Sequence, residues 1–345
     1  MIYIYSMILV TGGTGLAGSH LLYVLLEKGL PVRALHRKES NREEVKKILA
    51  YYSDKAEDLF SKIEWAEGDL LDTHSLEEAM NNVSDVYHCA AIVSMDADEG
   101  ERMIHNNVTG TANMVNAALE KKIRKFCYVS SVAALGIESG KEITEETPWN
   151  DQTGFSAYAI SKYLSENEVW RASQEGLDVV IVNPTIVIGP GNWNRSSGQI
   201  FRAAHKGLRW YSTGSMGYVD VRDVAKAMMR LMESDVVNQK FIVSAENRSF
   251  RDFFNLVYAS LGKPTPNKRA GKLLLEIGWR ADKFRSILTG SQHILTKEVA
   301  RYATTQLSYS GAKIEKTTGM NFIPIEEAIT HAAQHYLSDL NGPKK

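Results

Sequence analysis

Hydrophobic and polar positions follow two alternating patterns over about the first 185 residues. Short, almost wholly apolar runs are separated by longer stretches whose apolar residues recur at helical spacing. A continuous apolar run is typical of a strand buried on both faces, as in a parallel sheet. The runs lie at residues 7–10, 31–36, 63–66, 85–89, 126–130 and 179–183, and clear helical stretches lie at 15–28 and 103–121. This alternation predicts an α/β fold with a doubly wound parallel sheet.

The pattern changes after Pro184. Residues 185–217 are rich in glycine and show little strand pattern. Residues 218–233 then predict a strand end and a helix, 240–245 predict another strand, and the chain is mostly helical from 250 onward. We therefore expect two domains. One is a sheet domain of residues 1–184 and 218–245, and the other is a smaller, mostly helical domain of residues 185–217 and 246–345.

The composition is that of an ordinary globular chain. The 345 residues are 44% hydrophobic and 23% charged, which argues against a disordered or low-complexity protein. The 40 basic and 41 acidic residues leave a net charge of −1, so no overall field attracts nucleic acid or an anionic membrane. No run approaches the roughly 18 apolar residues that a membrane span needs. We expect neither nucleic acid nor a membrane as a partner.

The N-terminal segment and the cysteines favour a cytoplasmic location. Residues 1–10 lack the basic region and the cleavage site of a signal peptide. Both Met1 and Met7 stay open as the translation start. Cys89 and Cys127 lie in apolar runs, which is typical of buried free thiols in a reducing compartment rather than of a redox pair.

A glycine-rich loop follows the first strand and opens the first helix. It reads TGGTGLAG from residue 11 to residue 18. The first glycine of such a triplet permits a tight turn, the second lets the backbone approach a diphosphate, and the third allows the helix to pack on the strand. The free N–H groups of the helix then attract phosphate. We expect dinucleotide binding here, and the loop residues assigned to it are Gly12, Thr14, Gly15, Leu16 and Gly18. The loop lacks the Gly-Lys-Ser/Thr ending of a P-loop.

The charge at the end of the second strand indicates which dinucleotide is bound. Units that bind NAD carry an acidic residue about 20 positions beyond the loop. Here the strand ends in Leu-His-Arg-Lys, so Arg37 and Lys38 stand where that acid is expected. An arginine binds a 2′-phosphate bidentately. We therefore expect NADP as the cofactor. NAD stays open, because the same residues also fit a solvated basic strand end.

The ends of the third and fourth strands supply further candidate cofactor contacts. Asp69 and Leu70 follow the third strand, where Asp69 is placed to reach the adenine edge. An aspartate at this position also fits a turn or a helix cap. Ala90 and Ala91 end the fourth strand, where small side chains leave room for a ribose.

Tyr158 and Lys162 lie four residues apart, and so on one face of a helix. This spacing is common by chance, and Tyr51/Lys55 and Tyr309/Lys313 repeat it in this chain. Context favours the first pair, because Tyr158 opens the helix after the fifth strand, whose end carries Ser130 and Ser131.

These groups suit hydride transfer to a carbonyl, which leaves an alkoxide that needs a proton. Lowering the pKa of a tyrosine from about 10 to about 7 takes about 4 kcal/mol. A lysine cation about 4 Å away supplies about that much at an effective dielectric of about 20, although desolvation opposes it. We expect Tyr158 to donate the proton, Ser131 to orient the carbonyl oxygen, and Lys162 to lower the Tyr158 pKa and hold the nicotinamide ribose. The alternative is an ordinary Tyr/Lys pair on a helix face.

Together these residues resemble the extended short-chain dehydrogenases/reductases. The shared features are TGGTGLAG, the Ser131–Tyr158–Lys162 triad, NPTIVIGPG at 183–191 and YVDVRDVA at 218–225. VRALHR at 32–37 and ITEETPW at 143–149 look most like the dihydroflavonol and cinnamoyl-CoA reductase branch, which reduces ketones, aldehydes or thioesters with NADPH.

The resemblance carries further expectations. It implies a Rossmann NADP-binding domain, a C-terminal substrate domain, a small carbonyl or alcohol substrate, and a homodimer as one open oligomeric state. It implies that Ser131, rather than Ser130, is the catalytic serine, judged by its distance to Gly136. It also implies that Pro184, Thr185 and Ile186 line the nicotinamide.

Two other functions stay open. A nucleotide-sugar epimerase would use the same triad with a tightly held NAD, although many such enzymes carry an acid where this chain has Arg37. A non-enzymatic NADP sensor would need no intact triad. Dehydration of a sugar is disfavoured because Val132 and Ala133, rather than an acid pair, follow Ser131.

Three other groups of residues are weighed as candidate sites. His331 and His335 lie four apart but have no evident third ligand, so we predict no metal site. The basic residues Lys263, Lys268, Arg269 and Lys272 fit a solvated loop better than an anionic-substrate site. Trp193, Trp210 and Tyr211 fit a substrate pocket and core packing equally well.

Overall fold

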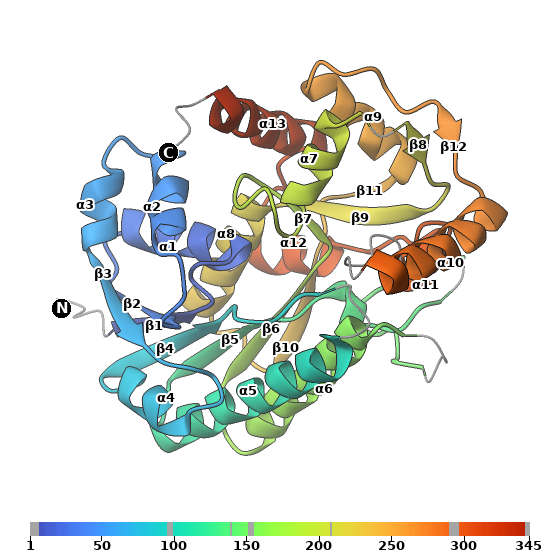
Figure 1. Ribbon diagram of the computed structural model, residues 1–345. Coiled ribbons are helices and arrows are strands. Elements are labelled where there is room, and N and C mark those ends of the chain that lie inside the picture. Colours follow the sequence, from blue (N-terminus) through green and yellow to red (C-terminus); the bar gives the residue numbers. More distant parts are fainter. Residues whose placement is uncertain are drawn as a thin grey trace.

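A computed structural model describes residues 7–94, 99–138, 140–150, 155–207, 209–289 and 297–341. Within these residues, seven parallel strands form the central sheet in the order β3-β2-β1-β4-β5-β6-β10 (Figure 1). The strands are β1 (Met7–Thr11), β2 (Val32–His36), β3 (Ile63–Glu67), β4 (Val83–His88), β5 (Lys125–Val129), β6 (Val179–Pro184) and β10 (Gln239–Val243). The expected doubly wound sheet is confirmed, and the order of its first six strands places the crossover point between β1 and β4.

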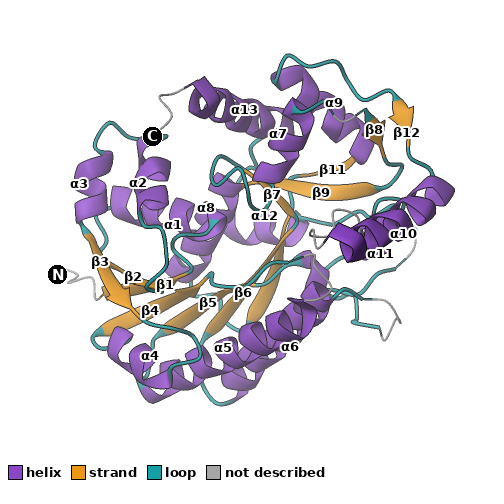
Figure 2. Cartoon of the chain, viewed as in Figure 1, coloured by secondary structure: helices purple, strands orange, loops and turns teal. Residues whose placement is uncertain are grey.

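Helices cover both faces of this sheet (Figure 2). One face carries α4 (Thr73–Ala79), α5 (Gly100–Glu120) and α6 (Ala157–Gln174), and the other carries α1 (Leu16–Glu27), α2 (Glu43–Ala50), α3 (Ala56–Ser61) and α8 (Val221–Glu233). Successive strand residues enter opposite layers: Leu9 packs with α5, while Ile8 and Val10 pack with α1. This two-sided burial is why the strands are apolar almost throughout.

The C-terminal half contains a second, smaller sheet that the sequence pattern did not predict. Its strands β7 (Ile186–Ile188), β9 (Ser215–Asp220) and β11 (Glu246–Ser249) lie in the order β11-β9-β7, and β8 (Trp210–Tyr211) pairs with β12 (Lys268–Arg269). The strands are short and their stretch is glycine-rich, so the alternation is weak. A Cβ at Gly217 in β9 would lie 2.5 Å from Cγ2 of Thr185. The backbone of β9 can therefore approach the Thr185 side chain this closely only with glycine at position 217.

Helices cover the small sheet, and one C-terminal helix returns to the large one. The helices of this half are α7 (Gly198–His205), α9 (Phe250–Ser260), α10 (Lys272–Thr289), α11 (Lys297–Tyr302), α12 (Ala312–Thr318) and α13 (Ile325–Asn341). Ile314 and Met320, in and after α12, pack into the layer of α1 and α8. The division of the chain into two domains at 184, 217 and 245 stays a prediction.

Two details complete the fold. Glu145, in the ITEETPW stretch, accepts a hydrogen bond from the Ile242 amide at 2.8 Å and so covers the outer edge of β10. Among the described residues, none of the helices is sufficiently long and apolar to cross a membrane.

Candidate active site

The glycine loop lies tightly against the end of β4. Gly12 has a φ of +67°, and a Cβ there would lie 2.6 Å from the Ala90 nitrogen. A Cβ at Gly18 would lie 2.3 Å from the Gly12 oxygen, and the Gly15 amide donates to that same oxygen at 2.9 Å. Only glycine fits position 12, where φ is positive and the backbone of Ala90 leaves no space for a side chain. Only glycine fits position 18, because the Gly12 oxygen occupies the space that a Cβ would need.

The start of α1 faces a hollow at the carboxyl ends of the strands. In the part of the chain that the structure describes, no side chain caps α1 at Gly15 and its first turn carries no acidic residue. Its N–H groups and positive dipole end are therefore available to an anion. The loop fits the diphosphate of a dinucleotide.

The hollow brings together eight of the sixteen predicted cofactor residues, which come from the ends of four different strands. Its lining includes Gly12, Thr14, Gly15, Arg37, Asp69, Leu70, Ala90 and Ala91. Leu16 lines an adjacent hollow, which shares Thr14 and Gly15 with the first. The other predicted cofactor residues line neither hollow: Gly18, Lys38, Tyr158, Lys162, Pro184, Thr185 and Ile186. Gly18 acts instead as a close-packing position.

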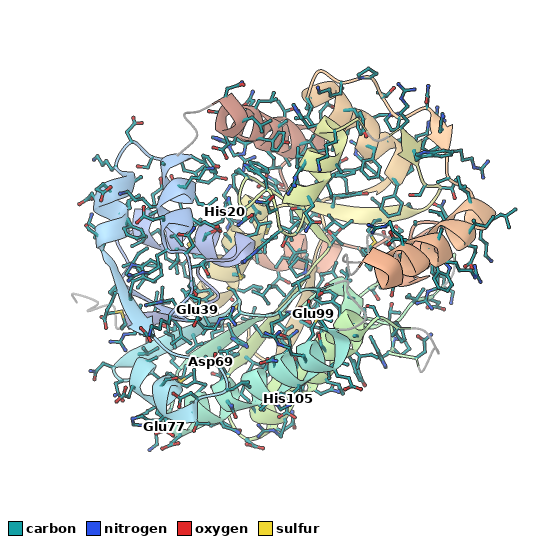
Figure 3. All side chains as sticks on the ribbon, in the orientation of Figure 1. His20, Glu39, Asp69, Glu77, Glu99 and His105 are labelled. Atoms are coloured by element: carbon teal, nitrogen blue, oxygen red, sulfur yellow. The ribbon has the colours of Figure 1, made fainter. Side chains whose placement is uncertain are left out.

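Asp69 makes a turn contact and also lines the hollow, while its contact with adenine stays a prediction. It lies in the loop between β3 and α4 (Figure 3) and lines the hollow. One oxygen of its carboxylate, Oδ1, also accepts the Leu71 amide at 2.8 Å, which is a turn contact. The turn therefore orients the carboxylate at the rim of the hollow.

Arg37 lies exposed directly after β2. Its amide donates to the Ser40 hydroxyl at 3.1 Å, and Ser40 lines the hollow beside it. Within the described ranges, the Arg37 guanidinium has no salt bridge to an acid. This cation is therefore available to an anionic ligand at the β2 end of the hollow.

Tyr158 and Ser131 lie near each other at the carboxyl end of β5. Tyr158 lies in the first turn of α6, which Ser156 caps by accepting the Ala159 amide at 3.1 Å. Burial raises the pKa of Tyr158, while the polar Ser131 side chain nearby opposes that rise.

Lys162 is buried one turn after Tyr158 and donates to the Val129 carbonyl at 2.8 Å. Burial lowers the pKa of Lys162 to about 8, and nearby Cys89 and Glu166 partly oppose that shift. The expected lowering of the Tyr158 pKa is not met in this structure. The reason is that desolvation dominates at Tyr158, while the lysine ammonium is bonded to backbone.

The two serines at the end of β5 have different partners. Ser130 donates to the carboxylate of Glu166 at 2.8 Å, whereas Ser131 faces Tyr158. Glu166 is buried and also accepts from Asn183 at 2.9 Å. The choice of Ser131 over Ser130 as the catalytic serine stays a prediction.

The remaining sequence candidates are placed as follows. Pro184 ends β6, and Thr185 donates its amide to the Val243 carbonyl at 3.1 Å before β7 begins at Ile186. Their contact with nicotinamide stays a prediction. Of the other Tyr/Lys pairs, Tyr51 donates to Asp339 at 2.6 Å, and Tyr309 is buried beside Ile143. His331 and His335 lie 3.3 Å apart between their Nε2 atoms.

A profile of the NAD dependent epimerase/dehydratase family matches residues 8–244. The chain belongs to this family. Its relatives include a putative dihydroflavonol 4-reductase of Synechocystis sp., 29% identical over 95% of this chain and 93% of that protein. Cinnamoyl-CoA reductase 1 of Petunia hybrida is 31% identical over 69% of this chain and 72% of that protein. The predicted resemblance is confirmed, and this family member is an NAD(P)-dependent oxidoreductase of the extended short-chain type.

Solved structures confirm the fold over nearly the whole chain. The crystal structure of gox2253 matches with a TM-score of 0.82 and 30% identity, covering 98% of this chain and 99% of that one. UDP-glucose 4-epimerase of Thermotoga maritima, crystallised with UDP-glucose, matches with a TM-score of 0.76 and 20% identity, covering 97% of this chain and 100% of that one. At that identity the epimerase shows the fold alone.

Sequence reasoning missed several residues of the site in this family member. Asn107 clamps the backbone after β4, accepting the Ile92 amide at 2.8 Å and donating to its carbonyl at 2.9 Å. Glu166 lies eight residues after Tyr158 on the same helix face, so helical spacing could have found it. Asn107 and Arg195 carry no local signal, because only the fold brings them to the hollow.

Proposed function

We propose that the protein is an NADP(H)-dependent carbonyl reductase of the dihydroflavonol reductase type. One observation carries the proposal: Tyr158 and Ser131 lie near each other at the end of β5, the strand beside β4, whose own end lines the hollow. This pair places a proton donor and a hydrogen-bond donor next to each other. Reduction of a carbonyl requires both groups at the carbonyl oxygen.

Each member of the triad has a proposed role. Ser131 donates a hydrogen bond to the carbonyl oxygen and holds it toward Tyr158. Tyr158 transfers its hydroxyl proton to the oxygen as negative charge develops there. Lys162 holds the nicotinamide ribose. Bound nicotinamide supplies the hydride, or accepts it in the reverse direction.

The electrostatics of the pair support a role for the cofactor in activating Tyr158. Without another positive charge, burial keeps the pKa of Tyr158 above its ordinary value. Lys162, with a pKa of about 8, still carries its proton at pH 7. We propose that ribose binding draws the ammonium away from the Val129 carbonyl toward Tyr158, so that the cation lowers the tyrosine pKa.

The cofactor preference is proposed from the end of β2. Arg37 and Ser40 line the hollow at the end of this strand, Lys38 follows Arg37 in the sequence, and Arg37 has no acidic partner among the described residues. A bound 2′-phosphate would supply the Arg37 guanidinium with a negatively charged partner. A charged hydrogen bond contributes roughly 1.5–3 kcal/mol, which corresponds to roughly a ten- to hundred-fold preference for NADP over NAD.

The substrate class follows from the relatives. Proteins named dihydroflavonol 4-reductase and cinnamoyl-CoA reductase align with this chain. We therefore propose a small ketone or aldehyde, or the corresponding alcohol in the reverse direction, as substrate.

The nature of the bound dinucleotide tests the proposal. The purified protein is denatured, the released dinucleotide is identified, and its exchange with free cofactor is measured in the native protein. We expect NADP(H) that exchanges freely, followed by oxidation of NADPH in a screen of aldehydes and ketones. Stoichiometric NAD that does not exchange would overturn the reductase and favour a nucleotide-sugar epimerase.

A further inference from the structure

The loop of residues 189–198 packs directly on the start of α1. A Cβ at Gly191 would lie 3.0 Å from Cδ1 of Leu16, and a Cβ at Gly189 would lie 2.2 Å from Cγ1 of Val221. Glycine at both positions lets the loop approach α1 and α8 closely. The loop therefore forms one wall of the hollow beside the glycine loop.

Side chains on other elements hold this loop in place. Asn192 donates to Glu44 of α2 at 2.7 Å, and Trp193 donates to Asp339 of α13 at 2.6 Å. Lys47 of α2 forms a salt bridge with that same Asp339 carboxylate at 2.7 Å. The loop is thus tied to both halves of the molecule.

The backbone is strained at the tip of the loop. Ser196 has a φ of +49°, which is unusual for a residue other than glycine and costs roughly 1–2 kcal/mol. Such a conformation persists only where the surrounding contacts determine it, and it occurs often at binding sites. Here it sets the direction of the chain directly after Arg195.

Arg195 lines both hollows that meet at the glycine loop. It shares this position with Thr14 and Gly15, so all three lie where the two hollows join. Arg195 is exposed, and in the described part of the chain its guanidinium forms no salt bridge. By contrast, the guanidinium of Arg202 in α7 donates a hydrogen bond to the side chain of Asn194.

Two positive groups therefore border the same small space. Thr14 and Gly15, directly before α1, line both hollows, and so does Arg195. Glu44 on the far wall already accepts a hydrogen bond from Asn192. An anion with several oxygens satisfies both positive groups at once, and a diphosphate matches an arginine through bidentate contacts.

We propose that Arg195 binds the diphosphate of the dinucleotide from the side opposite the α1 N-terminus. The inference rests on the dinucleotide binding in the proposed function and adds a binding residue from the C-terminal half. Arg195 would thus contribute affinity shared by NADPH and NADH, whereas Arg37 would discriminate between them.

Equilibrium binding tests this role without any turnover. Dissociation constants for NADPH, NADH, ADP-ribose and 2′-AMP are measured by calorimetry on the wild type, Arg195→Ala and the matched control Arg202→Ala. We expect Arg195→Ala to weaken NADPH, NADH and ADP-ribose by the same factor, roughly ten- to hundred-fold, because one charged hydrogen-bonding group is lost. Binding of 2′-AMP, which has no diphosphate, stays unchanged, and Arg202→Ala behaves like the wild type.

Several outcomes would overturn the assignment. Unchanged affinity for ADP-ribose in Arg195→Ala would remove the contact. An equal loss for 2′-AMP would show a general charge effect instead. Weaker binding of UDP with unchanged ADP-ribose would assign Arg195 to a substrate diphosphate. A wild type that binds NADPH but reduces no carbonyl would refute the proposed reductase and leave this binding test intact.

Discussion

The carboxylate of Glu166 accepts the hydroxyl hydrogen bond of Ser130 at 2.8 Å, one residue before the serine that contacts Tyr158. Successive residues of an extended chain point to opposite sides, so the two serines face different surroundings. Asn183 links them, because it donates to Glu166 at 2.9 Å and to the Ser131 carbonyl at 3.0 Å. Ser130 thus belongs to a buried network that supports Ser131.

This relationship predicts opposite effects for two neighbouring substitutions. Ser131→Ala should lower kcat by roughly 10²–10³, as loss of a donor to a developing oxyanion does. Ser130→Ala should preserve kcat but lower the free energy of unfolding by roughly 1–3 kcal/mol, because Glu166 loses a buried donor. Steady-state kinetics and urea unfolding of both variants measure these effects. Equal kinetic losses would contradict the division of roles.

Tyr158→Phe should lower turnover with NADPH by roughly 10²–10⁴, the usual contribution of a positioned proton donor. The Kd for NADPH should hardly change, because the ring and Lys162 remain. Tyr163→Phe is the matched control, since its ring stacks on Trp149 with centroids 4.2 Å apart on the same helix. Kinetics and calorimetry report the two quantities separately. Turnover retained in Tyr158→Phe would remove this residue from the mechanism.

Arg37→Glu should invert the cofactor preference. The carboxylate would repel a 2′-phosphate and accept the ribose hydroxyls of NADH, so the NADPH/NADH affinity ratio should fall by at least roughly ten- to hundred-fold. Arg42→Glu carries the same charge change nearby and is the control, because the Arg42 guanidinium lies over the Trp65 ring at 5.6 Å. A variant that still prefers NADPH would refute the Arg37 assignment.

Acid should destabilise the fold through buried histidines. Burial lowers the pKa of His20 to about 4 from its ordinary 6.5, and lowers that of His88 to about 3. The unfolded chain therefore binds more protons between pH 6.5 and 4. The contribution of His20 to the free energy of unfolding is therefore fully present above pH 6.5. It falls by about 1.4 kcal/mol for each pH unit as the pH drops from 6.5 to 4.

Urea unfolding between pH 7 and 4 measures this slope. His20→Gln should reduce the slope by about one proton, since its proton uptake on unfolding is lost. His105→Gln, on the exposed side of α5, should keep the wild-type slope. The same slope in His20→Gln and the wild type would contradict the assignment.

Much of this architecture was predictable because its causes are local. The two-faced apolar strands predicted the parallel sheet, and the strand–glycine loop–helix order predicted the tight loop that opens α1. Context also favoured Tyr158 over Tyr51, whose hydroxyl donates to Asp339, and over Tyr309, which is buried with Ile143. The small sheet was missed because β7 has only three residues and β9 lies in a glycine-rich stretch.

The sequence by itself determined which local structures form, since helical spacing, strand alternation and the backbone freedom of Gly12 depend on neighbouring residues. Only the tertiary structure decided that Ser130 bonds to Glu166, that Asn107 clamps the chain after β4, and that Arg195 reaches the glycine loop. These contacts join segments far apart along the chain. Close packing of the folded chain sets these contacts, and no local sequence pattern encodes that packing.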